Sequence, residues 1–300
     1  MTSSCPKLIA IYGPTASGKS VLAEAVSERL DAQLINADAF MVYQGLDIGT
    51  NKPKNEADYV LLDLVPPTHS FGVGEYIRAA EPILTSLFAR GKNVVLVGGT
   101  GFYLRALTEQ YTELSPPPDP QLRSELKRKD LTDLVEQLKN LDPRTAETID
   151  IKNPIRVQRA IERILTPSEP IRVQFPPFDV HKFGIVPPTE ALKSKIIERT
   201  RELLLTGWKE EVESLLQQGV PVDSPGFRAI GYHSVIGWIE GKIEFDELVE
   251  DVSRQTWQYA RRQLTWNRKE PNLKPISLES LDDKVYEQAV NQLMHSIGMS

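Results

Sequence analysis

The chain has 300 residues, of which 40% are hydrophobic and 25% charged, a composition that excludes intrinsic disorder, collagen and coiled-coil rods. Its single cysteine, Cys5, excludes an internal disulfide framework and a multi-cysteine zinc site. The sequence has neither a membrane span nor a signal-peptide core, so we expect no membrane partner and a cytoplasmic location. Taken over the whole chain, the net charge of −6 argues weakly against nucleic acid as a partner.

Apolar runs alternate with helical periodicity in the first third of the chain. Residues 7–12 are typical of a buried strand, and apolar residues recur at helical spacing over 19–30. Further strands are expected at 32–36 and 93–97, with a helix over 77–90 between them. This alternation predicts an α/β fold with a doubly wound parallel sheet.

A cluster of prolines near residue 116 ends this pattern. Helical segments follow at 121–127, 131–140 and 153–165. We expect these segments to form a helical insertion, residues 113–165, in a core made of residues 1–112 and 166–300.

The last part of the chain is predicted to be a helical C-terminal region. A returning strand is expected first, at residues 179–186. The helices that follow it are expected at 190–206, 209–218, 234–240 and 245–269, before a short tail.

A phosphate-binding loop (P-loop) follows the first strand. The segment Gly13-Pro14-Thr15-Ala16-Ser17-Gly18-Lys19-Ser20 matches G-x4-G-K-[ST] between a strand and a helix, the context that the motif requires. Its backbone N–H groups form an anion cradle, Lys19 supplies a charge for phosphoryl oxygens, and the Ser20 hydroxyl is placed to bind Mg²⁺. The strand at 93–97 runs into Gly98-Gly99-Thr100-Gly101 without the metal-binding Asp of nucleotide hydrolases. The absence of this Asp favours a protein that binds a phosphorylated substrate over a nucleotide hydrolase.

Asp38 lies at the end of the second expected strand, at the edge where open α/β sheets bind ligands. A carboxylate there can be a metal ligand, a hydroxyl binder, a general base or only a turn residue. The segment 41–53 that follows is long and is interrupted by glycine and proline residues. We interpret it as a functional loop that the core does not need.

Basic and aromatic residues gather near the end of the last long helix. Residues 254–269 contain no acidic residue and the following basic and aromatic ones: Arg254, Arg261, Arg262, Arg268, Lys269, Trp257, Tyr259 and Trp266. Arginine rows bind phosphates and aromatic rings stack on unpaired bases, whereas the alternative is a solvated charged face with its rings turned into the core. A second stripe, Arg156, Arg159 and Arg163, can instead pair with carboxylates such as Glu162. The local charge thus describes the partner better than the net charge does.

Together these motifs resemble those of the tRNA dimethylallyltransferase family over nearly all of the chain. The resemblance rests on GPTASGKS (13–20), INADAFMVYQGLDIGTNKP (35–53), LVGGTGFYLRAL (96–107), DPQLR (119–123), LDPRTA (141–146), NPIRVQRAIE (153–162), AIGY (229–232) and YARRQLTWNR (259–268). The P-loop alone is shared with many families, but its combination with GGTGFY and RQLTW is highly specific.

The resemblance implies transfer of a dimethylallyl group from dimethylallyl diphosphate to N6 of an adenosine next to the tRNA anticodon (position 37), with release of diphosphate. It implies that the P-loop holds the diphosphate, that Asp38 is the general base and that Thr100 contacts the substrate and the leaving group. It also implies Mg²⁺ as cofactor with Ser20 as a ligand, a monomer, and an insertion that closes on the anticodon stem-loop.

The family's tRNA contacts correspond to four segments and two single positions. These are Asp38, Ala39, Phe40, Met41, Thr100, Arg123, Ile155, Arg156, Val157, Gln158, Arg159, Arg228, Ala229, Ile230, Gly231, Tyr232, His233, Arg261, Arg262, Gln263, Leu264, Thr265, Trp266, Asn267 and Arg268. The chain departs from the commonest family text at Ala39, where serine is usual, and at Met41, where glutamine is frequent.

Three other interpretations stay open at this point. A small-molecule or nucleotide kinase would use the P-loop on ATP, although the strand-end Asp is missing. A prenyltransferase acting on free adenine nucleotides would have no use for the basic aromatic helix. An RNA-binding protein without turnover is conceivable because of Ala39 and Met41.

Overall fold

The computed structural model describes residues 5–53, 58–117 and 119–299. The chain divides into two compact units, one made of residues 1–110 and 175–300 and the other of residues 111–174. Every helix in the described part of the chain is too short or too polar to span a bilayer.

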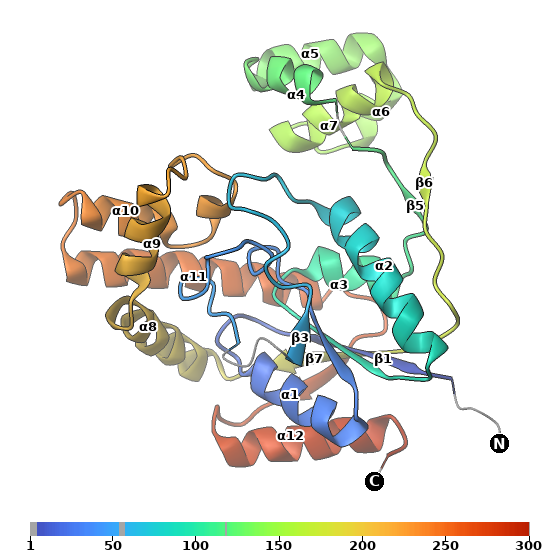
Figure 1. Ribbon diagram of the computed structural model, residues 1–300, viewed down its shortest axis with the longest axis vertical. Coiled ribbons are helices and arrows are strands. Elements are labelled where there is room, and N and C mark those ends of the chain that lie inside the picture. Colours follow the sequence, from blue (N-terminus) through green and yellow to red (C-terminus); the bar gives the residue numbers. More distant parts are fainter. Residues whose placement is uncertain (1–4, 54–57, 118, 300) are drawn as a thin grey trace. The chain divides into compact units, whose positions relative to one another are not determined.

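The first unit is built on a six-stranded parallel sheet with the strand order β3-β2-β4-β1-β7-β8 (Figure 1). Its strands are β1 (Lys7–Tyr12), β2 (Gln33–Asn36), β3 (Tyr59–Val60), β4 (Val94–Val97), β7 (Asp179–Val186) and β8 (Lys274–Ser277). The central strands β1 and β4 are continuous buried apolar runs, as expected where helices cover both faces of a sheet. The predicted α/β class with its parallel sheet is confirmed.

Helices cover the two faces of this sheet (Figure 1). On one face α1 (Lys19–Leu30) and α12 (Asp283–Ser296) share a core with Ile9 and Ile11 of β1. On the other face lie α2 (Val73–Ala89) and α3 (Gly101–Thr108), and the Tyr12 hydroxyl lies 3.4 Å from that of Thr108. Alternate residues of β1 therefore face opposite helix layers, which is the doubly wound arrangement.

The C-terminal segment is not the short tail that we expected. It forms β8, which pairs with β7, and then α12, which packs against α1. Only Ile276 of β8 is buried, so this strand lacks the apolar run that would predict a strand from the sequence. In α12 the buried residues Ala289 and Leu293 are spaced by one helical turn, a pattern that the sequence itself contains.

A layer of helices completes the first unit, close to the expected bounds: α8 (Thr189–Leu205), α9 (Trp208–Gln217), α10 (Tyr232–Ile239) and α11 (Phe245–Asn267). Their shared core includes Val42, Tyr43 and Leu46 from the segment after β2. The expectation that this segment is not needed for a core is therefore wrong for residues 42–46. Their irregular spacing hides the fact that they anchor the segment to the helices.

The second unit consists of short helices with a two-stranded antiparallel pair. Its elements are β5 (Glu113–Leu114), α4 (Pro120–Lys127), α5 (Leu131–Leu141), α6 (Pro143–Thr148), α7 (Pro154–Leu165) and β6 (Ile171–Arg172). Each helix has an Asp or Asn N-cap whose side chain accepts backbone N–H bonds, and proline follows the cap in α4, α6 and α7. Helix α6, which was not among the predicted helices, starts at such a cap, Asp142.

Candidate active site

The P-loop joins β1 to α1 and places Lys19 in a desolvated position. Gly18 caps α1 with a φ of 78°, a left-handed conformation that favours glycine. The Ser17 hydroxyl and the Lys19 ammonium both donate to the Pro14 carbonyl at 2.8 Å. Burial and the Arg199 cation lower the pKa of Lys19 to about 8, against the opposing effect of Asp38. An anionic ligand would favour the ammonium form and be held by it.

Arg199 of α8 is a second cation at this loop. Its Nη2 donates to the Thr15 hydroxyl at 2.6 Å. Burial lowers the pKa of Arg199 to about 10, so the guanidinium stays charged at neutral pH. Arg199 was not among the predicted site residues. It lies at helical spacing from Leu192, Ile196 and Leu203 and so interrupts an apolar face.

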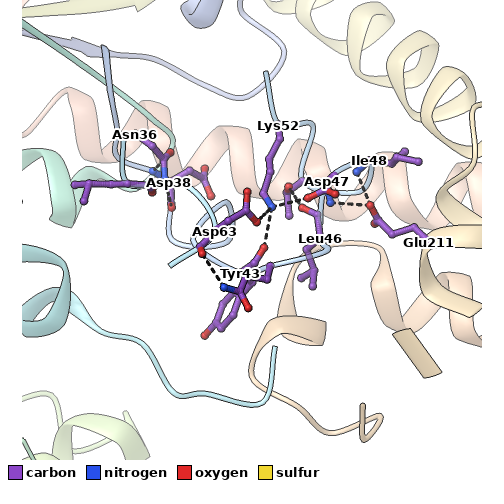
Figure 2. A network of polar contacts seen from close by, with 12 residues as sticks. Asn36, Asp38, Tyr43, Leu46, Asp47, Ile48, Lys52, Asp63 and Glu211 are labelled. Atoms are coloured by element: carbon purple, nitrogen blue, oxygen red, sulfur yellow. Dashed lines mark hydrogen bonds and ion pairs between the residues drawn. The ribbon is translucent and has the colours of Figure 1, made fainter. Parts of the chain in front are cut away.

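Asp38 is held in a turn directly after β2 (Figure 2). Its N–H donates to Asn36 Oδ1, and its own Oδ1 accepts the Phe40 N–H, both at 2.9 Å. The turn role that we considered for Asp38 therefore exists, but it occupies only one carboxylate oxygen. Oδ2 lies beside Gly99, where a Cβ would come within 2.8 Å of it. This oxygen is placed to meet a substrate.

Thr100 joins the Gly98–Gly101 loop to the segment that carries Asp38. Its hydroxyl accepts the Ala39 N–H at 2.9 Å, and its own N–H donates to the Ala37 carbonyl at 3.2 Å. A Cβ at Gly98 would lie 2.1 Å from the Ala37 carbonyl carbon, so only glycine permits this approach. The structure thus brings Asp38 and Thr100 together at the carboxyl edge of the sheet.

Helix α11 ties this loop to the P-loop through a single carboxamide. Gln263 accepts the Thr15 N–H and donates to the Gly99 carbonyl, both at 2.8 Å. The Tyr259 hydroxyl donates to the same carbonyl at 3.0 Å, and burial with the nearby Asp38 charge raises its pKa. Gln263, which the resemblance places among the tRNA contacts, is buried and acts inside the site.

Two cavities meet at Tyr259 and Arg262. The first has a volume of about 290 Å³ and borders Thr15, Asp38 and Arg199. It is also lined by Phe40, Gly49, Thr50, Asn51, Arg228, Ile230 and Trp208. The second has a volume of about 230 Å³, and its lining includes Gly13, Gly98–Gly101, Gln263, Trp266 and Asn267. The Asp38 carboxylate, the Arg199 guanidinium and the glycine-rich loops therefore line two neighbouring cavities that share Tyr259 and Arg262.

The exposed face of α11 is a basic groove of about 470 Å³. It is lined by Gln258, Arg261, Arg262, Thr265, Trp266 and Lys269. The aromatic rings of this helix face cations of the protein itself: Lys193 lies over Trp257, Arg105 over Trp266 and Arg262 over Tyr259. The helix combines both interpretations considered above, since its arginines point outward while its rings pack against protein groups.

The other predicted tRNA contacts of this unit differ in exposure. The exposed ones are Arg228, His233, Arg261, Arg262, Thr265 and Arg268. The partly buried ones are Ala39, Phe40, Met41, Ile230, Leu264, Trp266 and Asn267. The buried ones are Ala229, Gly231, Tyr232 and Gln263. The buried side chains support the surface from below and do not reach an RNA.

In the second unit, two predicted contacts are engaged in an ion-pair network. Glu162, whose side chain is fully buried, accepts from Arg123 at 2.7 and 2.9 Å and from Arg159 at 3.0 Å. The alternative raised for Arg159, pairing with Glu162, is what the structure shows. Val157 lies in the core of this unit, whereas Ile155 and Arg156 are exposed. Gln158 is partly buried.

The donor groups at the P-loop fit a magnesium ion held mainly by a substrate. No three His, Cys, Asp or Glu side chains of the described residues gather as a metal site. Mg²⁺ needs fewer protein ligands, because it keeps water and binds phosphate oxygens. Ser20 is exposed directly after Lys19, and its side chain also contacts Tyr59. A hydroxyl oxygen at this position is the kind of ligand that Mg²⁺ would accept beside a bound diphosphate.

A P-loop at the edge of a parallel sheet, with two cations and a carboxylate near it, is typical of proteins that bind phosphorylated substrates. The chain belongs to the IPP transferase family, whose model matches residues 41–270. It is 36% identical to tRNA dimethylallyltransferase 2 of Geotalea daltonii, over 89% of this chain and 86% of that protein. It is 37% identical to tRNA dimethylallyltransferase 1 of Trichlorobacter lovleyi, over 91% and 94%. The family resemblance inferred from the motifs is confirmed.

Solved structures agree with this assignment. The tRNA isopentenylpyrophosphate transferase of Bacillus halodurans superposes with a TM-score of 0.71 at 29% identity, covering 97% of this chain and 95% of that one. A eukaryotic dimethylallyltransferase that acts on tRNA superposes with a TM-score of 0.77 at 21% identity, over 98% and 78%, and shares the fold.

Proposed function

We propose that this protein transfers a dimethylallyl group from dimethylallyl diphosphate to N6 of an adenosine next to the tRNA anticodon, position 37, and releases diphosphate. Membership of the IPP transferase family and the names of its relatives support prenyl transfer to tRNA. The observation that carries the chemistry is that Asp38 and Arg199 border one cavity, with Lys19 close enough for Asp38 to influence its pKa.

In the proposed reaction the allylic C1–O bond breaks and the N6–C1 bond forms. The diphosphate leaves with the electron pair, and its growing charge is stabilised by Lys19, Arg199 and the P-loop N–H groups. Asp38 accepts the proton that the amine loses, which suits the carboxylate oxygen not used in the turn. Ser20 would provide a ligand for a bound Mg²⁺ ion, which would supply further charge neutralisation on the leaving group.

The tRNA is proposed to dock on the basic groove of α11, with the target adenine turned out of its stack into the cavity. Ile155 and Arg156 of the second unit are the side chains that we propose for contact with the anticodon stem-loop. The protein is proposed to act as a cytoplasmic monomer. Size-exclusion chromatography with light scattering tests the oligomeric state.

The function is tested with labelled dimethylallyl diphosphate. The protein is incubated with unmodified tRNA transcript and, in parallel, with the same tRNA carrying guanosine at position 37 and with AMP, ADP or ATP. Label only in the unmodified tRNA supports the proposal. Label only in a free nucleotide refutes it, and phosphate transfer from ATP without prenyl transfer indicates a kinase. Loss of transfer in EDTA, restored by Mg²⁺, tests the cofactor.

A further inference from the structure

The segment after β2, residues 43–52, is held by two charged side chains that the chemistry above does not use (Figure 2). We refer to these residues as the 43–52 loop. Its first residues are anchored by burial, since Tyr43 and Leu46 lie in the core of the helical layer. Beyond them Ile48 packs against the same core but is only partly buried, and Glu211 and Lys52 supply the charged contacts that hold this part of the loop.

Glu211 of α9 binds three successive backbone N–H groups of the loop. Oε2 accepts from Asp47 at 2.7 Å and from Ile48 at 2.5 Å, while Oε1 accepts from Gly49 at 3.2 Å. Successive N–H groups that converge in this way form an anion-binding concavity, which a carboxylate of the protein fills here. Bonds to a charged acceptor are about twice as strong as neutral ones, so this single side chain fixes the middle of the loop.

Tyr232 of α10 holds Glu211 in place from the other side. Its hydroxyl donates to Glu211 Oε1 at 2.7 Å. Burial and the Glu211 charge raise the pKa of Tyr232 well above its usual value, so the hydroxyl stays protonated and keeps donating. The carboxylate is thereby fixed between two helices and the loop.

Lys52 closes the loop at its other end. Its ammonium is almost fully buried and donates to the Tyr43 carbonyl at 2.8 Å, to Asp47 Oδ1 at 2.5 Å and to Asp63 Oδ1. The Lys52 ammonium therefore joins the two ends of the 43–52 loop. Since Asp47 is bound through its side chain by Lys52 and through its N–H by Glu211, the two anchors act on the same turn.

The turn so held forms part of the reaction cavity. Gly49, Thr50 and Asn51 line the cavity that Asp38 borders. A Cβ at Gly49 would lie 2.2 Å from Trp208 Nε1 and 2.6 Å from Tyr232 Cζ, so the chain passes in contact with both rings. The P-loop is tied instead to α11 and α8, through Gln263 and Arg199, and these contacts do not depend on the turn.

We propose that Glu211 is a positioning residue for prenyl transfer, which fixes the Gly49–Asn51 wall of the cavity and so aligns the acceptor adenosine with Asp38. The inference rests on the proposed function and adds a residue that acts through the backbone of the loop. Because the diphosphate cradle has its own anchors, loss of Glu211 affects use of the tRNA acceptor and spares binding of the prenyl donor.

The test compares Glu211→Ala with Glu210→Ala, which removes an exposed carboxylate from the neighbouring position of α9. For Glu211→Ala we expect kcat/KM for tRNA to fall by about tenfold to hundredfold, the scale of a small misplacement of reacting groups. KM for dimethylallyl diphosphate stays within about twofold of wild type. Glu211→Gln keeps one accepting oxygen and gives an intermediate loss, while Glu210→Ala matches wild type.

Wild-type kinetics in Glu211→Ala overturn the inference. The inference is also overturned if kcat falls while both KM values stay unchanged and the unfolding midpoint is lowered. That result means that the variant is only less stable, because loss of folded enzyme lowers kcat without changing either KM. If Glu211→Ala does not fold, Tyr232→Phe, which keeps the ring and removes the donor to Glu211, must show the same selective loss for tRNA, and wild-type kinetics there overturn the inference. Absence of prenyl transfer by the wild-type protein refutes the proposed function instead.

Discussion

The pH dependence of donor use follows from the environment of Lys19. Its pKa is lowered to about 8, chiefly by burial and also by the Arg199 cation. A lowered pKa in a base means that the ammonium is lost as the pH rises through about 8. With one such group, the charged fraction falls from about 0.9 at pH 7 to about 0.1 at pH 9. If the diphosphate binds only the ammonium form, kcat/KM for dimethylallyl diphosphate falls about tenfold over this range.

The assay measures initial rates of prenyl transfer from pH 6.5 to 9 at saturating tRNA, where kcat/KM for the donor reports ionisation of the enzyme–tRNA complex that the donor enters. The donor's own diphosphate titrates near pH 6 and is fully ionised over the upper half of this range. Lys19→Arg is the matched control, since arginine stays charged and removes the descending limb even where it lowers the rate. A profile that is flat to pH 9, or one that falls equally in Lys19→Arg, refutes the assignment.

Three further variants test separate parts of the molecule. Asp38→Asn keeps the turn but not the base, so we expect unchanged tRNA binding and a kcat at least about a hundredfold lower; an unimpaired variant removes Asp38 from this role. Changing Arg261 and Lys269 together to Ala reduces the slope of log affinity for tRNA against log salt by about 1.4 to 1.8, and an unchanged slope places the RNA elsewhere. Glu162→Gln lowers the free energy of unfolding by about 2 kcal/mol. The loss is smaller than for a fully buried ion pair because the two arginines that bind Glu162 are about 30% exposed. An unchanged urea midpoint contradicts this prediction.

Most of the fold was predictable because its elements have local signals. Strand β7 has the predicted bounds, residues 179–186, and helices such as α11 begin at the predicted residue. The errors arose where burial depends on distant parts of the chain. Strand β8 contributes one buried residue, Ile276, and the core residues Val42, Tyr43 and Leu46 lie in a loop without a regular period.

The candidate site likewise has residues that the sequence predicts and residues that it does not. The P-loop is a contiguous motif, and Asp38 and Thr100 follow strands whose ends must meet at one edge of a parallel sheet. Arg199 and Glu211 act on backbone and side chains that are 184 and 164 residues away along the chain. No local pattern in the sequence marks Glu211. An arginine on the apolar face of a predicted helix is the one signal that could have revealed Arg199.

Helix α11 has two functions on its two faces. Its buried side chains Gln263 and Tyr259 hold the P-loop and the Gly98–Gly101 loop together, while its exposed arginines line the basic groove. Arg262, adjacent in sequence to Gln263, borders both the groove and the two inner cavities. An RNA bound in the groove would therefore contact the same rigid helix that positions the reacting groups. If the proposed RNA contact is made, this helix links recognition of the acceptor to the position of the P-loop and the Gly98–Gly101 loop.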